Sequence, residues 1–124
     1  MNLVTLMNAT KIFNQFGQVQ ISPRLAYKIM KFCKGVASEE EFYNTRRNEI
    51  INKYALKDDD GNIMVSDDGM IRIIDGKIDE ANDALKELSN VEVDVPKIKF
   101  TLAELDELKL SVADMFVLDS FIEE

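Results

Sequence analysis

The sequence contains no histidine and no tryptophan, and its only cysteine is Cys33. A Ser-His-Asp or Cys-His catalytic centre needs an imidazole to carry a proton, and a structural zinc site needs several thiolates or imidazoles. A single chain of this composition supplies neither. One cysteine also closes no internal disulfide, which fits a reducing compartment. We therefore assign no catalytic, cofactor-binding or metal-ligating residue, and we expect a protein that is not an enzyme.

Long apolar runs are absent as well. No run approaches the roughly 18 residues that a membrane-spanning helix requires, and Met1 to Thr10 lacks the basic start and small-residue cleavage site of a signal peptide. Apolar residues nevertheless make up 46% of the 124 residues, which is enough for one compact core. The sequence therefore predicts a single domain over residues 1–124 that stays in the cytoplasm and contacts no membrane.

The net charge of -8 is divided unevenly along the chain. Residues 1–57 carry nine basic and four acidic side chains, whereas residues 58–124 carry six basic and nineteen acidic ones. A solvated surface of mixed sign is the favoured interpretation of this asymmetry. The alternatives are that it is satisfied within one fold, by packing of the acidic half beside the basic half, or between copies in a head-to-tail homo-oligomer. Because nucleic-acid binders are usually basic overall, the acidity argues against direct nucleic-acid binding.

Two helices are predicted in the basic half of the chain. Apolar residues recur at helical spacing over residues 3–16, and Gly17 supplies a stop. A second helix begins at Ser22-Pro23, because the serine hydroxyl can accept from the amides of the first turn and proline has no amide hydrogen to leave unpaired.

The second helix has two interpretations. Gly35, followed by Ser38 and three glutamates, is typical of a helix stop and a new capping box, which would give a helical hairpin. A continuous period of 3.6 residues, however, keeps one apolar face through the supposed break, formed by Leu25, Ile29, Phe32, Val36, Tyr43, Ile50 and Tyr54. A chain reversal has no reason to preserve this phase. We therefore favour one long helix over residues 23–56, about 50 Å in length, with a kink near Gly35.

This helix carries the candidate interaction residues Phe42, Arg46 and Arg47. Phe42 falls on the charged face, where an exposed aromatic side chain is a candidate for an interface. Arg47 and Glu40 instead fall on the apolar stripe, two turns apart, and both need polar partners. One interpretation is an ion pair, or an Arg47 that extends its charged end to water; the other is a contact at a subunit boundary.

The acidic half predicts a small antiparallel sheet. Residues 62–74 hold two β-rich runs joined by Asp67-Asp68-Gly69, which is a hairpin signal. Valines alternate with acidic residues over residues 91–95, so a strand at about 91–100 could pair with the hairpin. Residues from Asp75 to about Asn90 have the spacing of a helix that covers the sheet.

The Asp-rich stretch before the hairpin invites a calcium interpretation. Placing Gly61 at the sixth position of an EF-hand loop puts Leu56 at the first ligand position, and leucine has no side-chain oxygen. A solvated turn is the better interpretation of residues 58–68.

Two capping patterns precede the end of the chain. Thr101 can cap a short helical segment, and Ser111 with Asp114 predicts a C-terminal helix from about Val112 to Ile122. The apolar residues of this helix either complete the core or bury against another copy. The predicted fold class is therefore α+β: mainly helical, with one long helix, a small antiparallel sheet and a C-terminal helix.

The order of these features resembles a family of small uncharacterised proteins of phages and prophages of Gram-positive bacteria. The segments that carry the resemblance are Arg24-Leu25-Ala26-Tyr27-Lys28-Ile29, Arg46 to Ala55, Lys57-Asp58-Asp59-Asp60-Gly61, Glu87-Leu88, Val91-Glu92-Val93 and Leu118-Asp119-Ser120-Phe121-Ile122. They span most of residues 20–122 and contain no catalytic signature. Genes of this family tend to lie among those for phage structure. The resemblance therefore implies a protein partner of the virion or the host, with the protein in the host cytoplasm or in the virion.

Two functional hypotheses follow. The first is a non-enzymatic phage component with a structural, assembly or protein-interaction role. The alternative is a phage-encoded inhibitor of a host defence or nucleic-acid-binding protein, acting through the acidic surface between Asp58 and Asp94. The first predicts self-association or stable binding to a virion protein, and the second predicts salt-sensitive binding to a basic host protein.

Overall fold

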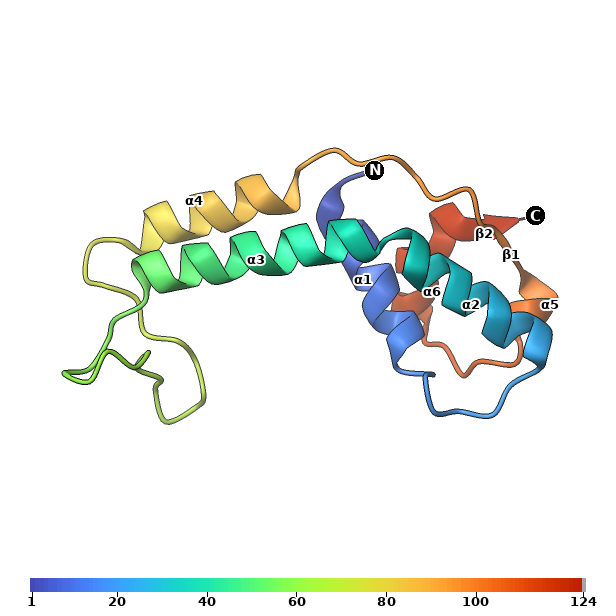
Figure 1. Cartoon of the computed structure of the whole chain (residues 1–124), viewed down its shortest axis with the longest axis horizontal. Coiled ribbons are helices and arrows are strands. Elements are labelled where there is room, and N and C mark those ends of the chain that lie inside the picture. Colours follow the sequence, from blue (N-terminus) through green and yellow to red (C-terminus); the bar gives the residue numbers. More distant parts are fainter. Residues whose placement is uncertain (124) are drawn as a thin grey trace.

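The structure, a computed structural model, describes residues 1–123 and shows an elongated molecule with a head and an arm (Figure 1). Within these residues the chain forms six α-helices, one 3-10 helix and a sheet of two strands. The elements in chain order are α1 (Leu3–Asn14), α2 (Pro23–Gly35), α3 (Ala37–Tyr54), α4 (Ile78–Ser89), β1 (Phe100–Thr101), α5 (Leu102–Leu105), α6 (Val112–Leu118), η1 (Asp119–Phe121) and β2 (Ile122–Glu123). We call α3, α4 and the connecting residues 55–77 the arm, and the remaining elements the head.

Four phenylalanines from four elements of the head form the centre of the core. Phe32 of α2 packs edge-on against Phe13 of α1, with ring centroids 5.0 Å apart, and against Phe121 of η1, at 5.1 Å. Phe100 of β1 lies 4.8 Å from Phe13. All four side chains are at most 1% exposed. Helices far apart in the sequence are thus held around one aromatic cluster.

The start of α2 is as predicted, but the helix over residues 23–56 is not continuous: it divides into two helices beside Gly35, where only a kink was predicted. The Ser22 hydroxyl accepts from the amide of Leu25, 3.3 Å away, and Pro23 is the first helical residue. The helix is then interrupted at Val36, whose backbone is not helical (φ -110°, ψ 9°), and α3 starts at the next residue. Val36 is 2% exposed, so the break places this side chain in the core.

No chain reversal accompanies the break, so the helical hairpin is wrong as well. α3 continues away from the head in the general direction of α2 (Figure 1). The apolar phase persists because the first part of the stripe, including Leu25 and Phe32, enters the head core. The second part, including Tyr43 and Ile50, is only half-buried. α3 itself has no buried residue.

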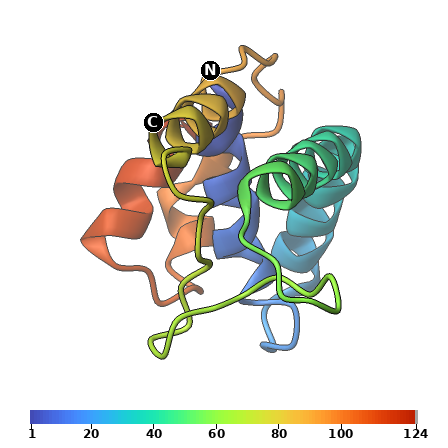
Figure 2. The same cartoon turned by 90° about the vertical axis from the view of Figure 1, so that its left-hand side faces the viewer.

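The arm consists of two antiparallel helices joined by an extended loop. α3 carries the chain outward, residues 55–77 turn at the far end, and α4 returns it to the head; Figure 2 looks along this arm from the loop end. On α4, Ala81 and Leu88 are buried. The helix predicted to end near Asn90 is therefore present.

The antiparallel sheet is wrong, because the two strands of the structure, β1 and β2, are parallel. Phe100 pairs with Ile122 and Thr101 with Glu123. The predicted hairpin forms only isolated antiparallel bridges, such as Val65 with Ile71. α4, about 18 Å long at 1.5 Å per residue, separates this hairpin from the segment after Asn90, so the two cannot pair.

The segment after α4 pairs with the N-terminus of the chain instead. The amide of Leu3 donates to the carbonyl of Val91 at 2.8 Å, and the amide of Val93 donates to the carbonyl of Met1 at 2.9 Å. The N-terminal ammonium also lies 3.1 Å from a carboxylate oxygen of Glu92. These contacts satisfy backbone groups that the sequence analysis assigned to a sheet.

Candidate functional site

Two capping boxes position the C-terminal part of the head. The hydroxyl of Thr101 accepts from the amide of Glu104 at 3.2 Å, while the Glu104 carboxylate accepts from the amide of Thr101 at 2.9 Å. Ser111 and Asp114 make the same reciprocal pair at 3.0 and 3.1 Å. The helix starts at Thr101 and Ser111 were both predicted from the sequence. The C-terminal helix, however, ends at Leu118, and a 3-10 turn replaces its last part.

The short elements that follow these caps divide their apolar residues between two sides. Leu118 and Phe121 are at most 1% exposed and complete the core. On the other side, Leu102 is 57% exposed, Val112 is 75% exposed and Phe116 is 79% exposed. An exposure of this size is unusual for three large apolar side chains that lie around one depression.

We call this depression the C-terminal groove. It has a volume of about 390 Å³ and is lined by Leu102, Val112, Met115, Phe116, Asp119 and Ile122. Five of the six lining side chains are apolar and the sixth is acidic. The groove is therefore suited to an apolar segment of another protein whose flanking residues are basic.

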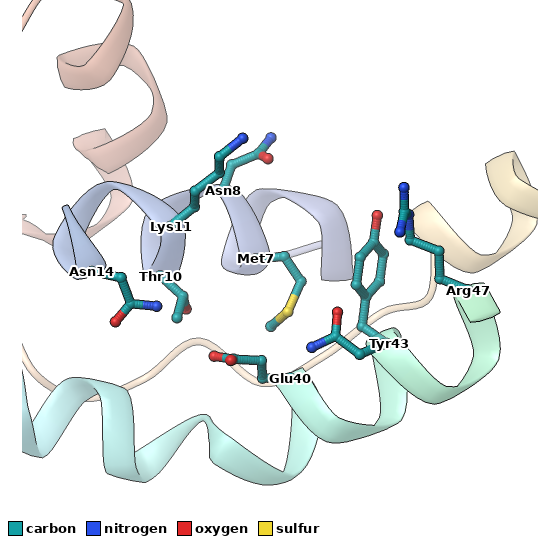
Figure 3. A pocket seen from close by; sticks show the side chains of 9 residues that line it. Met7, Asn8, Thr10, Lys11, Asn14, Glu40, Tyr43 and Arg47 are labelled. Carbon is teal, nitrogen blue, oxygen red and sulfur yellow. The ribbon is translucent and has the colours of Figure 1, made fainter. Parts of the chain in front are cut away.

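A second depression, of about 420 Å³, lies between α1 and α3 at the junction of head and arm. Figure 3 shows Glu40, Tyr43 and Arg47 of α3 across from Met7 and Thr10 of α1. The full lining is Met7, Asn8, Thr10, Lys11, Asn14, Glu40, Tyr43, Asn44 and Arg47. These side chains offer many hydrogen-bonding groups and charges of both signs, so this cleft suits a polar ligand better than an apolar one.

The ion pair expected for Glu40 or Arg47 is not formed. Residues 1–123 contain four ion pairs, and neither side chain takes part in any of them. Both side chains instead open into the cleft between α1 and α3.

The candidate interaction residues Phe42, Arg46 and Arg47 do not form one surface. The Arg46 guanidinium lies 5.7 Å from the centre of the Phe42 ring and 3.0 Å from a carboxylate oxygen of Glu49. Phe42 is 43% exposed, so it meets the condition set for an interface candidate. Arg47 lies about 100° further round α3 and lines the cleft instead. The structure thus brings Phe42 and Arg46 together and separates them from Arg47.

The groove residues Leu102 and Val112 were not among the candidate interaction residues predicted from the sequence. One signal pointed toward Val112 alone, because the C-terminal helix predicted to begin there is too apolar to be fully exposed to water. Which side chains of the C-terminal helix are buried depends on the conformation of the turn at residues 106–111. The spacing of apolar residues does not predict that conformation.

Residues 1–123 show neither a candidate metal site nor a candidate membrane-spanning helix. In this part of the chain no group of three or more cysteine, aspartate or glutamate side chains is arranged to hold a metal ion. No helix among these residues is both long and apolar enough to cross a membrane.

Cys33 lies beside the cleft and is half-buried. Burial, and then the nearby carboxylate of Glu40, raise the pKa of this thiol above its ordinary value. Because the thiolate is the nucleophile, we expect Cys33 to react with iodoacetamide at pH 8 at least about tenfold more slowly in the folded protein than in urea. Equal rates in the two states would contradict this. In Glu40→Gln the folded protein should react faster, by less than unfolding achieves, because burial is the larger cause.

A comparison with protein-family models assigns the chain to a family. The family model described as "Protein of unknown function (DUF1617)" matches residues 7–120. The match covers nearly all of both head and arm, so the chain belongs to this family, whose members are uncharacterised. No match was found among the curated proteins or among the solved structures.

Proposed function

We propose that the protein is a non-enzymatic component of a phage or prophage that binds a virion or assembly protein through its C-terminal groove. The observation that supports this most directly is the exposure of Leu102, Val112 and Phe116 around one groove. A soluble protein exposes large apolar side chains of this kind singly far more often than together. The proposal places the protein in the host cytoplasm during assembly or in the finished particle.

The acidic residue of the groove indicates the charge that the partner segment should carry. Among residues 1–123, Asp119 is the only charged side chain that lines it. A partner segment with apolar side chains in the groove and a lysine or arginine at its edge matches both features. Since most of the contact is apolar, binding should survive moderate salt, in contrast to binding that rests on charge alone.

We expect Phe116→Ser to weaken this binding by at least about tenfold, because a large aromatic side chain at the centre of an interface carries much of its affinity. The probe is the set of structural proteins from dissociated particles of the phage that encodes the chain, applied to the immobilised protein. Retained proteins are quantified at about 50 mM and about 500 mM NaCl, on either side of the screening range of surface charge.

Phe42→Ser is the matched control, since it also replaces an exposed phenylalanine but lies on α3. It should leave retention unchanged. If Phe42→Ser abolishes retention and Phe116→Ser does not, the groove is not the docking surface. If no structural protein is retained at either salt concentration, the proposed function is wrong.

The acidic arm favours a second candidate function, inhibition of a basic host protein. Asp58, Asp59 and Asp60 are all exposed in the loop at the far end of the arm. A cationic nucleic-acid-binding channel would attract such a loop. In host lysate this hypothesis predicts capture of a basic protein that is lost at about 500 mM NaCl and is unaffected by Phe116→Ser.

A further inference from the structure

The two ends of the molecule carry opposite charges. α2 lies in the head, and residues 55–77 form the opposite end of the molecule, at the far end of the arm (Figure 1). α2 contains four basic residues and no acidic one: Arg24, Lys28, Lys31 and Lys34. Residues 55–77 contain six aspartates, against two lysines and one arginine. The charge asymmetry of the sequence is therefore a separation in space, and the fold does not bring the two regions together.

Most basic side chains of α2 form no ion pair with the residues that the structure describes. Lys28 pairs with Glu104 at 2.8 Å. Arg24, Lys31 and Lys34 are exposed and take part in none of the ion pairs that residues 1–123 form. The Lys31 ammonium lies over the ring of Tyr27, 5.6 Å from its centre.

The exposed face of α2 is also partly apolar. Tyr27 is 58% exposed and Met30 is 44% exposed. Tyr27 lies four residues before Lys31 and Met30 four residues before Lys34, so all four side chains share one side of the helix. We call this face, formed by Tyr27, Met30, Lys31 and Lys34, the head face.

The tip of the arm combines the opposite charge with exposed apolar side chains. Val65 is 58% exposed and Met70 is 66% exposed, next to the exposed Asp67 and Asp68. We call residues 58–71 the tip. Head face and tip therefore complement each other in charge, and each offers apolar side chains for burial.

The tip is held in a defined shape. The side chain of Asp58 accepts from the amides of Asp60 and Asn62, both at 2.9 Å. The amide of Asp58 in turn donates to the carbonyl of Asn62 at 2.9 Å, and the amide of Ser66 donates to the carbonyl of Met70 at 2.8 Å. A preformed loop loses less conformational entropy on docking than a flexible one.

We infer that the head face binds the tip of a second copy of this chain, so that copies associate head to tail. The two surfaces lie on different parts of the molecule, and the contact is therefore heterologous. An open assembly always has one head face and one tip unoccupied, so copies add until the assembly closes into a ring or, where the geometry does not close, continue as an open filament. This association uses surfaces other than the C-terminal groove and does not depend on the proposed function.

Charge reversal at each surface tests the inference. The wild-type protein should show a weight-average mass above 14.1 kDa that rises with concentration. In sedimentation experiments this rise should be large at about 50 mM NaCl and small at about 500 mM NaCl, because surface charges are screened. Lys31→Glu with Lys34→Glu should weaken association by at least about tenfold, since acidic groups would then face the acidic tip. Asp67→Lys with Asp68→Lys should do the same from the other side.

Mixing the two variants gives the sharpest result. The first variant keeps a native tip and the second keeps a native head face, so an equimolar mixture should associate more strongly than either variant does alone. Lys97→Glu with Lys109→Glu is the matched control. This double variant changes the net charge as much as Lys31→Glu with Lys34→Glu does, but both of its substitutions lie outside α2. It should therefore weaken self-association less than the head-face variant does.

Three results would overturn the inference. The first is a wild-type mass that stays at 14.1 kDa at low salt and high concentration. The second is a mixture of the two reversed variants that remains monomeric. The third is an association that Phe116→Ser abolishes and charge reversal leaves intact, because the copies would then meet through the C-terminal groove. Failure to bind virion proteins leaves this inference untouched, so the two proposals fail independently.

Discussion

Phe32→Ala is expected to lower the free energy of unfolding by about 3–5 kcal/mol. Phe32 is fully buried and packs against aromatic rings from two other elements, Phe13 and Phe121, at centroid distances of 5.0 and 5.1 Å. Its truncation removes apolar burial and leaves a cavity that rings held by separate helices and turns cannot fill. Small domains are stable by only about 5–15 kcal/mol, so this variant should be close to unfolding at room temperature.

Urea denaturation followed by circular dichroism measures this effect. Phe116→Ala is the matched control, because the same atoms are removed from a side chain that is 79% exposed. We expect its unfolding free energy to differ from that of the wild type by no more than about 0.5 kcal/mol. Similar losses in both variants would show that the aromatic cluster of the head is not the centre of the core.

Local signals in the sequence predicted the starts of these helices well. Ser22, Thr101 and Ser111 each start a helix as expected, because a cap depends on residues within one turn. The apolar stripe of residues 25–54 also kept its phase. The stripe did not reveal the break at Val36, because an interruption of one residue leaves the helical phase nearly unchanged. The burial of Val36, which accompanies the break, depends on the rest of the head.

Pairing between distant segments was predicted poorly. The alternation at residues 91–95 indicates an extended segment, and an extended segment does not specify its partner. Its partner is the N-terminus, and the strands that do form, β1 and β2, are two residues each. A signal of two residues is too short for any periodicity to detect.

The candidate interaction site was predicted only in part. The position of Phe42 among charged residues was predicted, and its side chain is exposed in the structure. The more exposed Phe116 lay in a segment whose apolar residues could all have been core. Leu118 and Phe121 are core and Phe116 is not, a division that only the tertiary packing of the head determines.

Glu104→Gln is expected to lower the unfolding free energy at neutral pH by about 1–2 kcal/mol. One carboxylate oxygen of Glu104 accepts from the ammonium of Lys28 at 2.8 Å and from the amide of Thr101 at 2.9 Å. The side chain is only 17% exposed, so water replaces these partners incompletely. The substitution weakens the link between α2 and α5.

The same contacts predict how stability depends on pH. The hydrogen bond from Lys28, and then that from the Thr101 amide, hold the pKa of Glu104 below its usual value of 4.5. As pH falls, the unfolded chain therefore takes up a proton at this position before the folded chain does. The stabilisation is fully present above pH 4.5 and is lost as pH falls through the lower pKa of the folded state.

Urea denaturation at several pH values between about 3 and 7 separates this contribution from the others. Glu107, whose pKa is lowered by hydrogen bonds from the hydroxyl and then the amide of Ser22, loses its stabilisation over the same range. Wild-type stability should therefore fall with acidification, and it should fall less steeply in Glu104→Gln because that side chain no longer titrates. Glu107→Gln is the matched control and should keep the contribution of the Lys28 contact. Identical slopes for Glu104→Gln and wild type would show that the contact with Lys28 does not hold α2 against α5 in solution.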